Sequence, residues 1–350
     1  MIPVKNVYYM LSYAFQILKE QGYKNIETEN FENTAELFAA ILIKGVSLQV
    51  KRGLNQEYIA KTEPLSTIRG KVDITESIKG QTLLKKQLVC SYDEFSVNSY
   101  FNRIVKSTME LLLRADISKA RKKELRKLLV YFSEVETLDI YHINWQVRYN
   151  RNNQTYHLLI SICNLLVKGL LQTNKNGTSK LMDFLDEQRM CRLYEKFILE
   201  YYRKEFPAIS ASASQIPWQL DDEGFEDGAK LPVMQSDIML KYEEKVLIID
   251  AKYYEHTTQT QYDVHTLHSA NLYQIFTYVK NKETQLKDVP HEVSGMLLYA
   301  RTDESILPNN TYRMSGNKIS VKTLNLNCDF FEIAKQLNDI ATEHFGEAIN

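Results

Sequence analysis

The sequence predicts a mixed fold of the α+β or α/β class. We expect an N-terminal helical domain with protruding β-hairpins and a C-terminal domain with a mixed central sheet flanked by helices. Two observations predict this. Helix-period segments enclose short strand-like runs in the first half, and the second half reads helix, strand, strand, helix, strand. A chain of 350 residues is long enough for two such domains with sizeable cores.

The first half contains four segments in which apolar side chains recur at three- and four-residue steps: 6–18, 38–48, 98–113 and 119–132. Between the second and the third, shorter strand-like runs cover 57–74 and 82–89. Pro64, Gly70 and Gly80 interrupt these runs. We therefore expect helices that carry one or two extended hairpins.

The segment from Glu57 to Val89 is polar and would bury little surface by itself. Such a protrusion would suit insertion into a partner protein, so we predict this region to be partner-binding. The alternative is a small sheet that packs on its own helices.

A polar stretch, Gln172 to Lys180, holds a glycine and no apolar residue, which is typical of a break between domains. We therefore predict a partner-binding domain over residues 1–175 and a second, catalytic domain over 176–350.

The second half begins with a predicted helix over 189–206. A strand around 234–240 and a fully apolar strand over 246–249 follow, then a helix over 271–278 and a strand over 295–300. This order predicts a mixed sheet with helices on its faces.

Acidic and basic residues stand at the ends of the two neighbouring strands. Asp250 and Lys252 follow four consecutive apolar residues and, being two apart, share one face of a strand. Asp237 comes from the preceding strand. Mg²⁺ prefers carboxylate oxygens, lowers the pKa of a bound water and offsets phosphoryl charge, while a lysine can orient that water. We therefore predict Asp237 and Asp250 as metal ligands and Lys252 as the third catalytic residue, for cleavage of a phosphodiester.

The strand pattern alone is equally compatible with an ordinary ion pair at the end of a strand. An Asp-x-Lys triplet alone carries little information, and a similar triplet, Glu243-Glu244-Lys245, lies in a polar turn without a strand before it. The four apolar residues before Asp250 distinguish its triplet from the Glu243 triplet.

Two residues are candidates for a supporting role. Glu195, on the helix over 189–206, could hydrogen-bond a metal-bound water, or it could pair locally with Arg192. Gln274 shares a helix face with Tyr278 and could meet a nucleic-acid backbone, although such a helix is more often simply core.

The formal net charge of −1 argues against a protein that holds DNA tightly alone, which would more often carry a basic excess. One basic run, Arg121 to Lys127, could meet DNA phosphates or an acidic partner, or be a solvated helix face. No Gly-x-x-x-x-Gly-Lys-Ser/Thr motif occurs, so we expect that this chain binds no nucleotide itself.

The four cysteines show no Cys-x-x-Cys spacing and are expected to be reduced. We find no signal peptide and no apolar run long enough to cross a membrane. The expected location is the cytoplasm.

Several longer blocks resemble a known family. The order of elements and the Asp…Asp-x-Lys spacing resemble the PD-(D/E)xK nuclease superfamily. Blocks across nearly the whole chain are similar to the McrC family, the nuclease subunits of McrBC modification-dependent restriction systems in phage defence. These blocks are Ile2 to Ala14, Ile68 to Ile74, Asn102 to Thr108, Val246 to Tyr254 and His268 to Gln274.

The resemblance implies a PD-(D/E)xK nuclease domain in which Asp237, Asp250 and Lys252 match an intact motif. Glu195 and Gln274 fall where related nucleases place supporting residues. It also implies Mg²⁺ as cofactor, with Mn²⁺ as a substitute. The implied partners are an McrB-like AAA+ GTPase hexamer and double-stranded DNA carrying 5-methylcytosine, which the partner recognises. Family members stimulate GTP hydrolysis, and their N-terminal region inserts into the pore of the ring.

Two other functions remain open from the sequence. The chain could be a non-catalytic activator of an AAA+ ring, but an adaptor has no need of all three motif residues. It could also be a stand-alone repair nuclease, although a minimal nuclease domain would not need the large N-terminal region.

Overall fold

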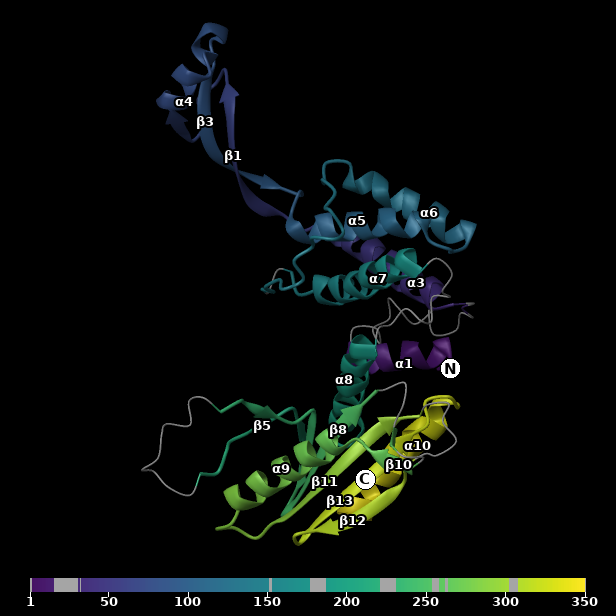
Figure 1. The fold of residues 1–350 in the computed structure, drawn as a ribbon. Helices are drawn as coiled ribbons and strands as arrows, with labels where there is room; N and C mark the ends of the chain where they lie inside the picture. Colours follow the sequence, from purple (N-terminus) through teal and green to yellow (C-terminus); the bar gives the residue numbers. More distant parts are fainter. Residues whose placement is uncertain are drawn as a thin grey trace. The chain divides into compact units, whose positions relative to one another are not determined.

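The chain forms two compact units, Met1–Phe31 with Leu185–Asn350, and Glu32–Phe184. Figure 1 shows the computed structural model. It describes residues 2–15, 31, 33–150, 153–176, 187–220, 231–253, 258–261, 264–301 and 308–349. The predicted division at residue 175 differs from this one, because the first helix belongs to the unit that contains the C-terminal half.

Aromatic packing explains where that first helix lies. Helix α1 (Val4–Ala14) carries Tyr13, whose ring meets those of Phe197 and Tyr201 at centroid distances of 5.7 and 5.3 Å. The Tyr13 hydroxyl also donates to Glu205 Oε1 at 2.8 Å. These partners lie on helix α8 (Glu187–Glu205). Aromatic pairs of this kind add to area burial, so α1 is held by side chains distant in sequence.

The first unit is built on a sheet of six strands: β4 (Ser210–Ser212), β7 (Ile238–Tyr242), β8 (Lys245–Lys252), β11 (Glu292–Ala300), β12 (Asn310–Met314) and β13 (Asn317–Leu324). Their order is β12-β13-β11-β8-β7-β4. Strands β8, β11 and β13 are parallel, and the outer strands pair antiparallel with their neighbours. The predicted mixed sheet is confirmed. The shorter strands form two further pairs, β5 (Gln215–Ile216) with β6 (Met234–Gln235) and β9 (Thr258–Gln261) with β10 (Val264–Leu267).

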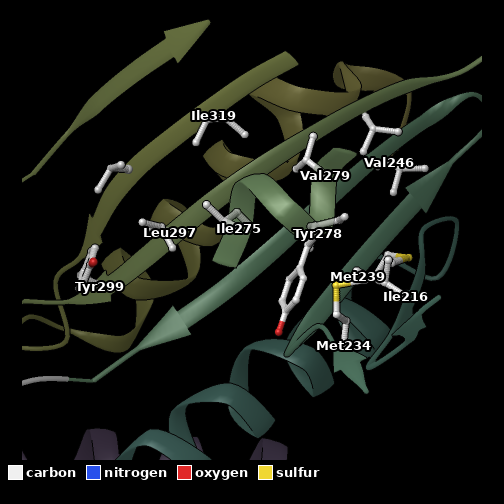
Figure 2. Packing of buried hydrophobic residues seen from close by; sticks show 13 residues of the cluster. Ile216, Met234, Met239, Val246, Ile275, Tyr278, Val279, Leu297, Tyr299 and Ile319 are labelled. Atoms are coloured by element: carbon white, nitrogen blue, oxygen red, sulfur yellow. The ribbon is translucent and has the colours of Figure 1, made fainter. Parts of the chain in front are cut away.

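Helices cover both faces of this sheet. Helix α9 (Ser269–Gln285) packs on one face through Ile275, Tyr278 and Val279, which join a buried cluster with side chains of β7, β8, β11 and β13 (Figure 2). A Cβ at Gly295 would lie 2.8 Å from both Ile275 and Val279, so the absence of a side chain there lets the helix approach β11. On the other face lie α8 and α10 (Phe330–Phe345), joined by a hydrogen bond from the Tyr202 hydroxyl to the Leu337 carbonyl. A short 3₁₀ turn, Glu347–Ile349, follows α10.

The second unit has a helical part and a small sheet. Its helices are α3 (Thr34–Arg52), α5 (Tyr100–Arg114), α6 (Lys119–Leu129) and α7 (Tyr156–Asn176), with a 3₁₀ turn at Val130–Phe132. Asn33, Ser99 and Ser118 cap the first three by accepting backbone N–H groups at the helix start. The predicted helices at 38–48, 98–113 and 119–132 thus correspond to α3, α5 and α6 with its turn.

The segment predicted as hairpins forms a three-stranded antiparallel sheet with a helical tip, which extends away from the helices of its own unit (Figure 1). Strand β3 (Leu88–Ser96) lies between β1 (Glu57–Leu65) and β2 (Lys71–Asp73). The tip consists of α4 (Ile74–Lys79) and a 3₁₀ turn at Thr82–Lys85. We call the segment Glu57–Ser96 the finger.

The predicted linker at Gln172 to Lys180 is helical at its start, because α7 continues to Asn176; the rest lies outside the described residues. The sequence pattern did not predict most of α7, nor did it predict α10. Within the described part of the chain, no helix has the length and apolar character needed to cross a membrane.

Candidate functional site

The predicted motif residues meet at one end of two neighbouring strands. Strands β7 and β8 pair with Ile238 opposite Ile249, so the next positions, Asp237 and Asp250, also stand opposite each other. Val246 to Ile249 are buried, which holds β8 in the centre of the sheet and fixes Asp250 at its end. The Glu243 triplet lies in the turn between the same strands, where Glu243 has a positive φ of 50°.

Two contacts define the geometry of the pair. Lys252 Nζ lies 2.7 Å from Asp250 Oδ2, and the two side chains are only 13% and 2% exposed. Asp237 Oδ2 accepts a hydrogen bond of 2.9 Å from the Ala251 backbone N–H. The structure therefore brings Asp237, Asp250 and Lys252 together, as the sequence predicts.

Glu195 joins this group from α8. Its Oε1 accepts a hydrogen bond of 3.1 Å from the Cys191 thiol, one turn earlier on the helix. The same thiol lies 3.8 Å from the Ala251 carbonyl oxygen, between the two motif residues of β8. The charges of Lys252 and Asp250 affect the pKa of Glu195 more than the charge of Arg192 does. Glu195 is therefore coupled to the motif residues and not only to Arg192.

The three carboxyl groups share one electrostatic environment. Burial, followed by the charges of Asp250 and Glu195, raises the pKa of Asp237 to about 8. Burial also raises the pKa of Asp250, opposed by Lys252 and by hydrogen bonding to Asp237, and it raises the pKa of Glu195. Asp237 therefore holds its proton more tightly than an ordinary aspartate, and the Lys252 charge favours the ionised form of Asp250.

The donor set suits a hard divalent cation. Three buried or half-buried carboxyl groups face a single ammonium group, and the Asp250 Oδ1 atom has no hydrogen-bond partner within the described residues. A cation held by Asp237 and Asp250 would balance this charge. No group of three or more His, Cys, Asp and Glu side chains in the described ranges is arranged to hold an ion alone. Mg²⁺, which keeps several waters and takes substrate phosphate as ligand, fits such a site.

Gln274 makes a hydrogen bond within α9. Its Nε2 donates to the Tyr278 hydroxyl at 2.9 Å on the same face of α9, and Tyr278 belongs to the buried cluster under that helix (Figure 2). The contact ties the half-buried Gln274 side chain to the packed face of α9, and its supporting role at the site stays a prediction.

The sequence reading missed Cys191, which it treated only as a small hydrophobic residue. The thiol links Glu195 to the Ala251 backbone, and burial is the main cause that raises its pKa to about 12, so it stays protonated as a donor. The four-residue spacing between Cys191 and Glu195 was the available signal, since such residues are neighbours on a helix.

Comparison with known proteins agrees with the sequence resemblance. Residues 4–300 match the model of the family described as McrBC 5-methylcytosine restriction system component. The chain is 29% identical over 347 residues to the type IV methyl-directed restriction enzyme EcoKMcrBC of Escherichia coli K12. The matched region covers 98% of each sequence.

A solved structure shares the fold. It is a half-complex of Thermococcus gammatolerans McrB AAA+ hexamers with bound McrC, matched at a TM-score of 0.52 and 17% identity over 97% of this chain and 76% of that one. Because the family model covers most of the sequence, the chain belongs to the McrBC 5-methylcytosine restriction system component family.

Proposed function

We propose that this chain is the nuclease subunit of a GTP-driven restriction complex, which cleaves double-stranded DNA carrying methylated cytosine. The observation that carries the proposal is the meeting of Asp237, Asp250 and Lys252 at the ends of β7 and β8. The family membership and the E. coli relative support the same reading. The first unit would then be a PD-(D/E)xK nuclease domain.

Each residue has a role in this proposal. Asp237 and Asp250 would hold Mg²⁺, for which Mn²⁺ could substitute, and the cation would supply an activated water and charge stabilisation at the phosphate. The Ala251 N–H keeps the Asp237 carboxylate oriented. Lys252, now beside Asp250, is the cation that can turn to the attacked phosphoryl group. Glu195, whose pKa is raised by burial, would be the group that accepts a proton from that water.

We further propose that the finger binds an AAA+ GTPase ring and stimulates its GTP hydrolysis. Its segment Glu57 to Val89 exposes large apolar side chains, which is costly unless another molecule covers them. They are Tyr58 at 74%, Ile68 and Ile74 at 65%, Ile78 at 61%, Leu83 at 52% and Leu84 at 82%. The solved McrB assembly with bound McrC supports this choice of partner.

The test of this function uses the full chain with an AAA+ GTPase of the same restriction system. Plasmid with and without 5-methylcytosine is incubated with Mg²⁺ and either GTP or no nucleotide, and linear product is quantified. We expect cutting only when the partner, GTP and methylation are all present. Cutting of unmethylated plasmid by this chain alone would instead support a stand-alone nuclease, and GTPase stimulation without any cutting would support a pure activator.

A further inference from the structure

Helix α6 of the second unit carries a dense row of positive charge on its outer side. Leu125 and Leu128 are buried and fix the inner side of the helix. Positions at four-residue steps share a face, so the side away from the leucines is lined with cations. These are Lys119, Lys122, Lys123, Arg126 and Lys127, which we call the basic strip.

The basic strip works against the stability of its own helix. Lys119 and Lys123, Lys122 and Arg126, and Lys123 and Lys127 are each four residues apart, and like charges at this spacing repel. The first turn contains no acidic residue, so Lys119 stands unfavourably near the positive end of the helix dipole. Residues that break local rules in this way are expected at functional surfaces.

The acidic side chains near the basic strip, Glu36 and Glu124, pair with Arg121 instead. Glu36 of α3 accepts the Ser118 N–H and lies 3.7 Å from Arg121 Nε. Glu124, which is the one acid within α6, lies 3.4 Å from the same arginine. No ion pair joins the basic strip to a carboxylate in the described part of the chain. Lys119, Lys123, Arg126 and Lys127 are exposed, and Lys122 is half-buried at the edge of the strip.

We propose that the basic strip binds the phosphate backbone of duplex DNA and helps to hold the substrate. This inference rests on the proposed function, because it takes DNA to be the substrate. Lys119 to Lys127 spans about 12 Å at 1.5 Å per residue, and duplex DNA carries one charge per roughly 1.7 Å of its axis. Backbone contacts position a protein on DNA without reading its sequence, so a row of cations with no base-reading side chains is sufficient for this role.

The experiment compares the full chain with a triple variant, Lys123→Gln, Arg126→Gln and Lys127→Gln. Anisotropy of a labelled, unmethylated duplex of about 30 base pairs is followed over a salt series from ~20 to ~200 mM. We expect the variant to bind about tenfold or more weakly at ~0.1 M salt, with a salt slope reduced by about 2 to 3. Glutamine forms helix well and removes the repulsion, so the thermal midpoint should not fall.

A matched control replaces three exposed lysines of the first unit, Lys241, Lys287 and Lys335, by glutamine, which should leave the slope near that of the wild type. Equal slopes for the α6 variant and this control would overturn the inference, as would the absence of measurable wild-type binding at low salt. Unchanged DNA binding with lost stimulation of GTP hydrolysis would assign the strip to an acidic protein surface instead.

The outcome is separable from that of the proposed function, because binding is measured without cleavage. A wild-type chain that binds through α6 but never cuts would defeat the nuclease proposal and leave this inference standing.

Discussion

The Ala251 N–H donates to Asp237 Oδ2 over 2.9 Å, so the residue between Asp250 and Lys252 also fixes the third motif residue. Apart from an exchange to proline, a substitution at position 251 leaves this N–H in place, so the orientation of Asp237 follows from the pairing of β7 with β8. The sheet therefore holds the site in place, and the pKa values of its carboxyl groups depend on the charges of Asp237, Asp250 and Lys252.

Metal binding should release a proton. Since burial raises the pKa of Asp237 to about 8, the carboxyl group holds a proton at neutral pH that Mg²⁺ must displace. We expect about one proton released per Mg²⁺ near pH 7, and almost none above about pH 9. Titration calorimetry in two buffers of different ionisation enthalpy measures this number. No proton release near pH 7 would contradict the assignment.

The same pKa predicts how stability varies with pH when no metal is added. The folded-state pKa of Asp237 lies above the ordinary value of about 3.9. Its contribution to the free energy of unfolding is therefore fully present below pH ~3.9 and is lost as the pH rises through about 8. Asp237→Asn removes this dependence. In chelator, the melting temperature of the variant should therefore exceed that of the wild type by a margin that grows as the pH rises from about 4 to about 8. The control is Asp339→Asn, a change at an exposed aspartate. Parallel curves for variant and wild type would refute the prediction.

Cys191 should act on cleavage by holding Glu195. Replacing it with valine removes the thiol donor at Glu195 Oε1, and losing one hydrogen bond of about 1 kcal/mol predicts a decrease in cleavage rate of roughly fivefold. Serine keeps a donor and should restore most of the rate. The acidic limb of the pH–rate profile should move in the valine variant but not in the serine variant. Equal losses in both, with unchanged profiles, would indicate packing alone.

Gly70 should be required for the finger. It has a φ of +67°, and a Cβ there would lie 2.4 Å from the Ser91 carbonyl oxygen on β3. Gly70→Ala should therefore disrupt β2 and reduce stimulation of the partner's GTP hydrolysis. Gly53→Ala is the control, because Gly53 has a φ of +99° with nothing within 4 Å of the added Cβ. Its substitution therefore carries a backbone cost of about 1 to 3 kcal/mol without a steric clash. Full stimulation by Gly70→Ala would argue against a role for the finger.

The predictable parts of the fold were those with a local signal. The apolar run before Asp250 indicated a buried strand, and the three- and four-residue periodicity gave α3, α5, α6, α8 and α9. The place of α1 was not predictable in this way, since it depends on Tyr13 meeting Phe197 and Tyr201 nearly two hundred residues later.

The site shows the same limit. The pattern around Asp237, Asp250 and Lys252 could be read from strand alternation. The role of Cys191 depends on its 3.8 Å approach to the Ala251 carbonyl, which is a tertiary contact. The hydrogen bond from Gln274 to Tyr278, in contrast, follows from their four-residue spacing on α9, which the sequence already shows.

The most direct test of the central claim measures two activities of Asp250→Asn in one reaction with the AAA+ partner, GTP, Mg²⁺ and methylated plasmid. Asparagine keeps the shape of the side chain but removes the charge that pairs with Lys252. We predict that plasmid cleavage is lost while stimulation of GTP hydrolysis stays at the wild-type level, with Asp339→Asn unchanged in both. Cleavage at the wild-type rate by Asp250→Asn would contradict the assignment of this site.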